Sequence, residues 1–495
     1  LEYRYTGSNT GTGIAMFYAK SGASNSTNVN IVNSTSTTGG LVGLYANGGG
    51  TFTNNGNVNG DANASYEFGI ATENTDLSNI GNITLGEASG ILGSTAEPAT
   101  PNVGIFAKTA NTITNGGNIS VGKSSIGIYG YNVTTTGDIT VGDSGVGIYS
   151  QSGNVTLNGN TMKVGKAITD SSNEENGAAA VYIVGSGQTV TNNANAINIG
   201  DGSFGFVNAN TNGGNSIISN TSGVVTLGNN AVYIYSSDSG TGATVKNYTP
   251  LKSTGSLNYG VYSAGNVEND ADIDFSSGIG NVGIYSINGG TAINKAGRTI
   301  TIGASNSDPT AKQYAIGMAA GYIGDATTPA YTGNIENHGT INVNGEYSIG
   351  MYGINSGTKV YNGTSLAELH TAVINLNGSN TTGIYLDNGA YGYNYGTIQS
   401  NGTGLKKVVG VVVKAGSTIE NHGIIDIDAS EAVGLLSKGN AAGQNPGIIK
   451  NYGTLNIRGA GAQNTQLPQA GQEISKDMAG IKIHAPAGSP TATIT

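Results

Sequence analysis

The amino-acid sequence predicts an all-β fold, a single right-handed parallel β-helix (solenoid) of about 17 three-strand coils. Three observations support this prediction. A short Gly-Ile-Tyr phrase recurs from one end of the chain to the other, the segments around it alternate apolar and polar residues, and Asn-x-Gly clusters separate these segments. We therefore expect residues 1–495 to form one continuous β-helix fragment.

The recurring phrase sets the length of the repeat. Its copies are about 29 residues apart on average and about 20 at the closest, which suits one supersecondary unit per repeat. A looser copy is Ala180-Val181-Tyr182, and Ala231-Val232-Tyr233 aligns with the phrase as well. The clearest copies are Gly127-Ile128-Tyr129, Gly147-Ile148-Tyr149, Gly260-Val261-Tyr262, Gly283-Ile284-Tyr285, Gly350-Met351-Tyr352 and Gly383-Ile384-Tyr385.

Each repeat is expected to contain three short strands. The first strand alternates apolar and polar residues, as in residues 119–121 and 139–141; the second carries the phrase, and the third is exemplified by residues 417–421. Alternation with a period of two gives each strand one apolar face. No helical periodicity links the strands, so the economical arrangement is a coil in which each strand pairs with its copy one turn later and inward Ile and Val form a continuous core.

Asn-x-Gly clusters are predicted to form the corners of the coils. They occur at residues 115–117, 337–339 and 421–423. Asn and Gly tolerate left-handed backbone angles, so we assign the clusters to bends of the chain. Asn side chains repeated at one level of the coil are also expected to stack as a ladder.

Composition excludes several classes of function. The net charge is −10 and the few Lys and Arg residues are scattered singly, so a phosphate-binding surface and a nucleic-acid partner are not expected. The chain has no Cys, which rules out disulfides and thiolate metal sites. No apolar stretch approaches the length of a membrane span, and the residues after Leu1 do not have the pattern of a signal peptide.

The repeat style resembles the passenger domains of large Gram-negative autotransporter adhesins. The residues that carry this resemblance are the Ile-x-Val-Gly segments, the Gly-Ile-Tyr phrase and the Asn-x-Gly corners, in a chain with few charges and no Cys. Among these adhesins it is most similar to the long surface adhesins of oral anaerobes. The resemblance implies type V secretion, display at the cell surface, and an anchor in the outer membrane through a C-terminal barrel that lies outside a chain ending at Thr495.

The resemblance also implies the partners. We expect a monomer that binds a host cell-surface protein or glycan, or the surface of a partner bacterium, and that contributes to cell adhesion and virulence. No cofactor and no metal are expected.

A column of tyrosines is the first candidate binding feature. If Val146 and Ile148 face inward, Tyr149 points outward and Gly147 leaves space beside it. Exposed aromatic ladders suit sugar rings or partner side chains. The alternative, cross-strand stacking that only stabilises the sheet, is left open. The predicted column comprises Tyr129, Tyr149, Tyr262, Tyr285, Tyr352 and Tyr385.

Inserted segments are the second candidate feature. Extra residues fall between the first and second strands at 91–102, 167–177, 304–313 and 459–478, and another insertion covers 321–334. Repeated insertion at one corner places these loops along one edge of the coils, and loops on a rigid scaffold commonly carry recognition. In the last loop, Gln463, Gln466 and Gln469 are candidate ligand-binding residues.

Several patterns that suggest catalysis have a simpler structural interpretation. His338 and His422 occupy a corner that holds Tyr in other coils, so we interpret them as corner fillers. The segment 142–145 resembles a serine-protease nucleophile loop, but no His lies upstream and the repeat phrase follows it directly. The chain also has no calcium-binding nonapeptide and no phosphate loop.

Paired carboxylates at Asp272 and Asp274, and at Asp426 and Asp428, fit the outward positions of strands. Because glycosidases use clustered carboxylates, a β-helical polysaccharide-active enzyme is the main alternative function. A structural stalk without ligand is the third. The sequence favours a non-enzymatic adhesin that binds through loops and one outward face of a rigid rod.

Overall fold

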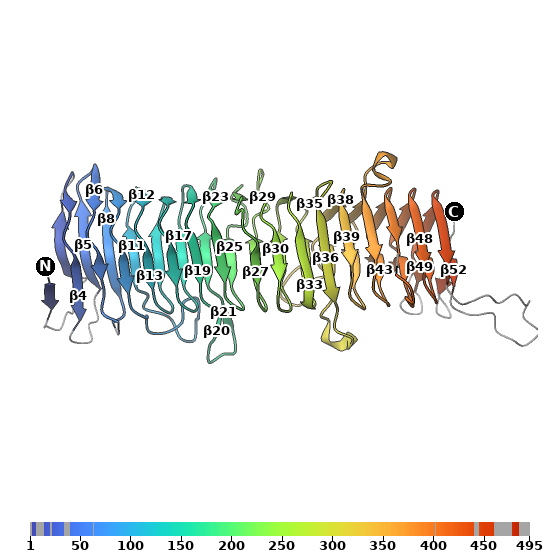
Figure 1. The fold of residues 1–495 in the computed structure, drawn as a ribbon, viewed down its shortest axis with the longest axis horizontal. Helices are drawn as coiled ribbons and strands as arrows, with labels where there is room; N and C mark the ends of the chain where they lie inside the picture. The colour runs from blue at the N-terminus through green and yellow to red at the C-terminus, as the bar shows by residue number, and fades with distance from the viewer. Residues whose placement is uncertain are drawn as a thin grey trace, which may run out of the picture. The chain divides into compact units, whose positions relative to one another are not determined.

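The computed structural model describes residues 2–5, 14–19, 22–33, 40–62, 64–400, 402–439, 445–459 and 478–484. The chain divides into two compact units, residues 1–250 (unit 1) and 251–495 (unit 2), and each is described by itself. In each unit the chain winds into coils of three strands, which pair in parallel with the equivalent strands of the neighbouring coils (Figure 1). The all-β parallel β-helix predicted from the repeat is confirmed.

Unit 1 contains three parallel sheets, named here by the place of their strands in the coil. The first-strand sheet comprises β1 (Glu2–Tyr5), β4 (Val29–Asn33), β7 (Val58–Asn59), β10 (Ile83–Leu85), β13 (Ile119–Val121), β16 (Ile139–Val141), β19 (Thr161–Val164) and β24 (Ala196–Ile199), and β27 (Val225–Leu227) is the first strand of the next coil. The second-strand sheet comprises β2 (Ile14–Ala19), β5 (Leu41–Asn47), β8 (Glu67–Glu73), β11 (Val103–Ala107), β14 (Ile126–Gly130), β17 (Val146–Ser150), β22 (Ala179–Ile183), β25 (Phe204–Asn208) and β28 (Val232–Ser236). The third-strand sheet comprises β3 (Ser24–Asn25), β6 (Thr51–Asn54), β9 (Asp76–Asn79), β12 (Thr112–Asn115), β15 (Asn132–Thr135), β18 (Val155–Asn158), β23 (Thr189–Asn193), β26 (Ser216–Ser219) and β29 (Thr244–Asn247).

Unit 2 repeats the same three sheets. Its first strands are β30 (Leu251–Ser253), β33 (Ile273–Ile279), β36 (Thr299–Ala304), β39 (Thr340–Val343), β42 (Val373–Leu376), β45 (Thr397–Gln399), β48 (Ile424–Asp428) and β51 (Thr454–Arg458). Its second strands are β31 (Tyr259–Ser263), β34 (Val282–Ser286), β37 (Ile316–Ala320), β40 (Ile349–Ile354), β43 (Thr382–Asp387), β46 (Val409–Lys414), β49 (Val433–Lys438) and β52 (Ala479–His484). Its third strands are β32 (Asn266–Asn269), β35 (Thr291–Asn294), β38 (Asn334–Asn337), β41 (Lys359–Asn362), β44 (Tyr391–Asn394), β47 (Thr418–Asn421) and β50 (Ile448–Asn451).

Inward apolar residues stack in register to form the core. Ile119 pairs with Ile139 in the first-strand sheet, and Ile128 pairs with Ile148 in the second-strand sheet. All four side chains are buried, whereas Ser120 between two inward residues is exposed. Burial of one such side chain stabilises the fold by about 2 to 3 kcal/mol, so the alternating first strands supply a continuous apolar interior.

The glycine of the repeat phrase interrupts the alternation of the second strand. A Cβ added at Gly147 would lie 2.7 Å from the buried Cε of Met162, so Gly147 faces the interior, as does Ile148. Val146 therefore lies on the outer side with Tyr149, where both line the same groove. The expectation that Val146 faces inward is wrong, because two consecutive residues face the core at this point.

Tyr233 also differs from its predicted place in the repeat. The register pairs Phe206 with Ile234 and Val207 with Tyr235, which puts Tyr233 level with the inward-facing Gly205. Tyr233 is fully buried, with its hydroxyl 2.6 Å from Ser219 Oγ, and burial raises the pKa of its phenol. The phrase in this coil is thus 232–235, and Tyr235 is its outward tyrosine.

A ladder of asparagines, all buried except the half-buried Asn451, follows the third strands, as predicted from the sequence. Each side-chain amide in a run donates to the side-chain oxygen of the next coil at 2.7 to 3.0 Å. Most also donate to the backbone oxygen two residues on, which fixes the bend. The runs comprise Asn25, Asn54, Asn79 and Asn115 in unit 1, and Asn269, Asn294, Asn337, Asn362, Asn394, Asn421 and Asn451 in unit 2.

The glycines of the Asn-x-Gly corners are required for a different reason than expected. Gly117, Gly339 and Gly423 do not have positive φ angles. Instead, a Cβ at Gly117 would overlap the carbonyl oxygen of Gly81 in the preceding coil, and the other two positions are equally crowded. Close approach of neighbouring coils, not left-handed backbone geometry, selects glycine at these corners.

The inserted segments lie between the strands of the coils. Residues 91–102 connect β10 to β11, residues 304–313 connect β36 to β37 and contain the 3₁₀ helix η1 (Pro309–Ala311), and residues 321–334 connect β37 to β38. Residues 167–177 contain the antiparallel hairpin of β20 (Ile168–Thr169) and β21 (Glu175–Asn176). Most of 459–478 lies outside the described residues. Within the described ranges, no helix has the length and apolarity needed to cross a membrane.

Candidate functional site

Two outward columns run along the second-strand sheet of unit 1. The column that contains the predicted tyrosines is called the aromatic column, and the parallel column three residues earlier in each strand is called the flanking column. The aromatic column comprises Tyr45, Ala71, Phe106, Tyr129, Tyr149, Tyr182, Val207 and Tyr235. The flanking column comprises Phe68, Val103, Ile126, Val146, Ala179, Phe204 and Val232.

Four consecutive rings of the aromatic column stack on one another. The ring centroids of Phe106 and Tyr129 are 5.1 Å apart, those of Tyr129 and Tyr149 are 5.1 Å apart, and those of Tyr149 and Tyr182 are 5.5 Å apart. The three tyrosine rings are nearly parallel, with interplanar angles of 1° and 7°. Burial raises the pKa of all three phenols, so they remain neutral at physiological pH. This stacking covers ring faces and directs ring edges and hydroxyls outward.

The other four predicted tyrosines belong to unit 2. Tyr262 and Tyr285 meet edge to face at 5.0 Å, and Tyr352 and Tyr385 are tilted by 31° at 5.8 Å. The register places Ala319 between these two pairs. All six predicted tyrosines are partly exposed on the outer side of their strands, so the column faces outward in both units.

Polar contacts occupy part of the unit 2 column. The hydroxyl of Tyr285 donates to the carbonyl of Gly321 at 2.7 Å. Lys414 lies 5.5 Å from the centre of the Tyr385 ring and pairs with Asp387 at 3.1 Å. These contacts tie the unit 2 tyrosines to neighbouring backbone and charges.

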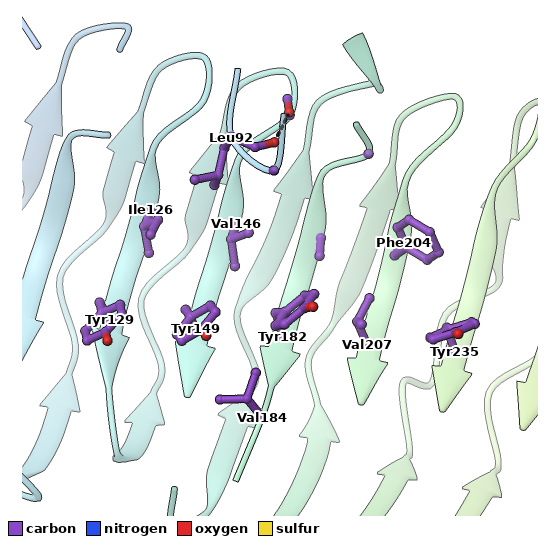
Figure 2. A pocket seen from close by; sticks show the side chains of 14 residues that line it. Leu92, Ile126, Tyr129, Val146, Tyr149, Tyr182, Val184, Phe204, Val207 and Tyr235 are labelled. Carbon is purple, nitrogen blue, oxygen red and sulfur yellow. Dashed lines mark hydrogen bonds between the residues drawn. The ribbon is translucent and has the colours of Figure 1, made fainter. Parts of the chain in front are cut away.

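A groove opens beside the aromatic column in unit 1. Its volume is about 640 Å³. Ring edges form one side, and the flanking column and inserted residues form the other (Figure 2). The lining residues are Leu92, Gly93, Ile126, Tyr129, Ser144, Val146, Tyr149, Gly177, Ala179, Tyr182, Val184, Phe204, Val207 and Tyr235.

Two inserted segments, 91–102 and 167–177, border the groove and contact each other; together they are called the ledge. Ser94 Oγ donates to Asp170 Oδ2 at 2.6 Å, and the backbone N–H of Ser171 donates to Glu97 Oε1 at 3.1 Å. The hydrogen bond from Ser94, with further bonds inside the hairpin, lowers the pKa of Asp170. The ledge therefore joins segments that are more than 70 residues apart in the sequence.

The ledge has an acidic outer surface. Glu97, Glu174 and Glu175 are exposed, whereas Asp170 is buried and its carboxylate accepts from Ser94 inside the ledge. An exposed lysine, Lys166, lies directly before the hairpin. The groove is thus lined by apolar and aromatic residues, and the two ledge segments beside it carry exposed carboxylates.

The serine of the 142–145 segment has a structural role. Ser144 Oγ donates to the carbonyl oxygen of Leu92 at 3.0 Å, which fixes the ledge over the groove. Ser144 adopts a left-handed backbone angle (φ 53°) at a turn, and Ser124 does the same one coil earlier. This hydroxyl is therefore engaged with the ledge and not with a histidine.

The histidines lie in unit 2, where two of them occupy the predicted corner. His422 stacks between Tyr395 at 4.7 Å and Tyr452 at 4.8 Å. His338 bridges two carboxylates, with Nδ1 2.7 Å from Glu368 and Nε2 3.2 Å from Glu336. The side chain of His484 lies outside the described residues.

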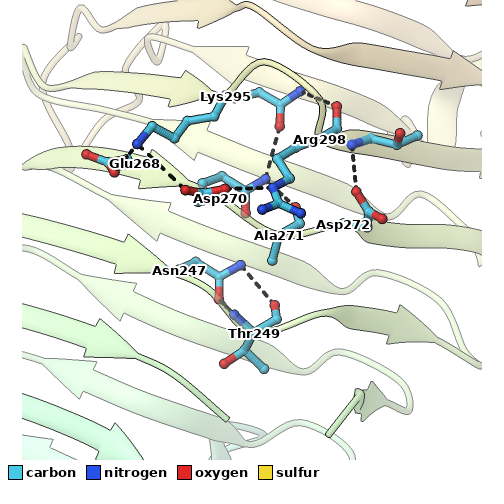
Figure 3. A network of polar contacts seen from close by, with 11 residues as sticks. Asn247, Thr249, Glu268, Asp270, Ala271, Asp272, Lys295 and Arg298 are labelled. Atoms are coloured by element: carbon cyan, nitrogen blue, oxygen red, sulfur yellow. Dashed lines mark hydrogen bonds and ion pairs between the residues drawn. The ribbon is translucent and has the colours of Figure 1, made fainter. Parts of the chain in front are cut away.

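The paired carboxylates face outward as predicted and have structural partners. Asp272 accepts from the backbone N–H of Thr299 at 2.8 Å, and Asp426 pairs with Arg458. In the same part of unit 2, Lys295 pairs with Glu268 at 2.6 Å and Arg298 pairs with Asp270 at 2.6 Å (Figure 3). Among the residues that the structure describes, no group of three or more His, Cys, Asp or Glu is arranged to hold a metal.

Two features of the structure are not predicted by the repeat pattern, and three predicted ligand-binding residues lie outside the described part of the chain. The segment 363–372, with the 3₁₀ helix η2 (Leu366–Glu368), is a further insertion at the third-strand corner. Tyr361 and Tyr393 stack at 4.7 Å on the outer face of the third strands of unit 2, a contact signalled only by their equal position in the repeat. Gln463, Gln466 and Gln469 lie outside the described residues, so their predicted role remains a prediction.

Comparison with known proteins identifies the family. The family model described as "BigA third pectate lyase-like domain" matches residues 131–395, more than half of the chain. No curated protein and no solved structure is significantly similar to this chain. The match includes the strands β17, β22, β25 and β28, which supply much of the groove. The chain therefore belongs to the family of BigA third pectate lyase-like domains.

Proposed function

We propose that this chain is a surface-displayed adhesin passenger that attaches cells by binding a protein or glycan in the groove of unit 1. The observation that carries the proposal is the convergence of two features, the ledge and the aromatic column, on one groove of about 640 Å³. Membership of the family supports a β-helical, passenger-like domain of a bacterial surface protein.

The side chains around the groove are held in place by contacts within the chain itself. Its rings are held by stacking at 5.1 to 5.5 Å, and its ledge is held by the Ser94–Asp170 and Ser144–Leu92 hydrogen bonds. Side chains that are already ordered lose little entropy on binding. Concave, mostly apolar sites with a few polar groups at the border are the usual form of a ligand site.

Binding is favoured over catalysis because the groove lacks an arrangement of reactive groups. Of its lining residues, Ser144 is the one with an aliphatic hydroxyl, and that hydroxyl donates to the Leu92 carbonyl. The family description "pectate lyase-like" supports polysaccharide cleavage as the alternative, although one fold serves many functions. Incubation with polygalacturonate tests this alternative directly, because an eliminating lyase generates an unsaturated product with new ultraviolet absorbance.

Attachment of coated particles tests the proposed function. Fluorescent beads carrying the chain are expected to bind epithelial cells or partner bacteria more than beads carrying albumin. Leu92→Asp places a charge in the groove and is expected to reduce attachment at least about tenfold. Val224→Asp, at a residue that is 60% exposed and outside the groove, is the matched control and should bind like the unmodified chain. Equal attachment by both variants contradicts the proposal.

A further inference from the structure

The aromatic column of unit 1 has one position without a ring between two tyrosines. The register pairs Tyr182 with Val207 and Val207 with Tyr235. Figure 2 shows Val207 between the two rings, with Phe204 beside it. Four stacked rings thus end at a short aliphatic side chain, after which the column resumes with a tyrosine.

The spacing of parallel strands implies a gap about as wide as one planar ring. Neighbouring parallel strands are about 4.8 Å apart, so side chains two strands apart are separated by roughly 10 Å. The filled positions show the spacing of an occupied step, since Tyr149 and Tyr182 stack at 5.5 Å with an angle of 7°. A ring placed above Val207 would continue this stack.

The walls of the gap favour an aromatic ring over a sugar. Val207, which is 7% exposed, forms its floor, and both Val207 and Phe204 line the groove. Phe204 forms one side, where its ring meets that of Tyr235 edge to face at 6.2 Å. A pyranose inserted here would direct hydroxyls at Val207 and Phe204, and buried hydroxyls without partners are costly. An aromatic ring has no such groups and gains stacking on Tyr182.

The charge of the ledge indicates which residues of a partner lie beside the ring inserted above Val207. Leu92, Gly93 and Gly177 of the ledge line the same groove as Val207. The exposed carboxylates of Glu97, Glu174 and Glu175 belong to the same two segments. Exposed carboxylates on the segments that line the groove are complementary to cationic side chains next to an aromatic one.

We propose that the gap above Val207 receives one aromatic side chain of a partner protein, flanked by Lys or Arg residues that face the ledge. This inference rests on the proposed function, because it assigns the ligand class of the same groove. It selects protein over glycan as the partner.

The absence of tryptophan from the chain makes the test direct. The probe is the peptide acetyl-Gly-Arg-Trp-Arg-Gly-amide, whose indole fluorescence reports binding without background from the protein. Titration with the full chain is expected to give a saturable blue shift. The same peptide with Leu in place of Trp should fail as a competitor, and one with Glu in place of Arg should bind at least about tenfold more weakly.

Substitutions at Val207 test the position of the ring. Val207→Tyr fills the gap with the chain's own ring and is expected to weaken peptide binding at least about tenfold. Val207→Ala keeps the gap open and should retain binding, which separates blockage from general disturbance of the site. Val412→Tyr makes the same change in the column of unit 2, between Tyr385 and Leu436, and should bind like the unmodified chain.

Three outcomes overturn the inference. The first is full peptide binding by Val207→Tyr when its thermal unfolding matches that of the unmodified chain. The second is the absence of a saturable blue shift of the indole fluorescence. The third is displacement of the peptide by millimolar methyl glycosides. The last result assigns the gap to a sugar. Bead attachment that still depends on Leu92 in any of these cases leaves the proposed function intact, so the two failures are distinguishable.

Discussion

Steric crowding decides the identity of single residues at the corners and inside the coils. Gly117 lies against the carbonyl oxygen of Gly81, whereas its neighbour Gly116 is exposed and has no atom closer than 3.7 Å to an added Cβ. Both are glycines in one Asn-Gly-Gly corner, so the sequence alone does not distinguish them. The crowding arises from contact between coils that are 36 residues apart, a distance visible in the Asn79–Asn115 ladder bond.

Alanine substitution separates these two glycines. Gly117→Ala is expected to lower the free energy of unfolding by about 2 to 4 kcal/mol, because the backbone of two coils must separate to admit a methyl group. Gly116→Ala is expected to change it by less than about 0.5 kcal/mol. Denaturant unfolding followed by circular dichroism measures both, and equal values would refute the steric explanation.

A buried carboxyl in unit 1 makes stability depend on pH. Glu67 is inaccessible to solvent, and burial raises its pKa to about 7 although the N–H of Asp61 donates to it. The free energy of unfolding is therefore highest below the ordinary carboxyl pKa of 4.5, where Glu67 is neutral in the folded and the unfolded chain. It falls as the pH rises through about 7, the pKa of Glu67 in the folded chain. The loss amounts to roughly 3 kcal/mol.

Glu67→Gln removes this dependence. The variant is expected to lose less stability than the unmodified chain between pH 5 and pH 8, since an amide does not ionise. Melting temperatures measured across this range check the prediction. A loss of stability by Glu67→Gln over this range as large as that of the unmodified chain would contradict the prediction.

Repeating elements explain both the success and the errors of sequence interpretation. Alternation in segments such as 119–121 was sufficient to predict strands, their pairing and the stacked core. A period of two places Val146 inside the coil, whereas Gly147 and Ile148 both face inward and put Val146 on the outer side. The place of Tyr233 is ambiguous in the sequence because two overlapping segments, 231–233 and 232–235, both resemble the phrase. The partners Ser94 and Asp170 belong to insertions that have no repeat, so their contact could not be predicted.

The buried asparagine ladder is expected to contribute strongly to stability. Asn337 accepts from Asn294 at 3.0 Å and donates to Asn362 at 2.9 Å, and it is fully buried. Asn337→Ala leaves a donor and an acceptor unpaired and should cost about 2 to 4 kcal/mol. Asn344→Ala, at an exposed asparagine that accepts from Asn377, should cost less than about 0.5 kcal/mol. Chemical denaturation compares the two, and similar costs would show that the internal ladder has no special role.

The segment 363–372 is expected to be held by a pH-dependent contact. The hydrogen bond to Glu336, and that to Glu368, raise the pKa of His338 against the opposing effect of burial. Despite burial, the Thr364 N–H and His338 lower the pKa of Glu368. The contact is therefore strongest between the ordinary values of 4.5 and 6.5, weakens as the pH rises through the raised pKa of His338, and weakens in acid as Glu368 is protonated.

Hydrogen exchange of amides in 363–372 measures this effect. After correction for intrinsic rates, protection should fall above neutral pH in the unmodified chain, whereas His338→Gln should show low protection throughout. His370→Gln, at an exposed histidine of the same segment, should behave like the unmodified chain. Protection that is independent of pH in the unmodified chain would exclude the proposed contact.

At the scale of the whole molecule, a repetitive scaffold supports one irregular site. In unit 1 the coils supply evenly spaced rings, and two insertions supply the ledge that turns one face into a groove. The sequence indicated the rings and the insertions separately, but it did not show that they meet. Their meeting follows from the coil positions of 91–102 and 167–177, which place both segments beside Tyr129, Tyr149 and Tyr182.

Competition by the free chain tests the central claim, that attachment occurs through this groove. Increasing concentrations of soluble unmodified chain are added to cells before beads coated with the same chain. We predict that the unmodified chain and Val224→Asp block attachment with equal half-maximal concentrations, while Leu92→Asp requires at least about tenfold more. Equal inhibition by Leu92→Asp would contradict the claim and place the attachment site elsewhere on the molecule.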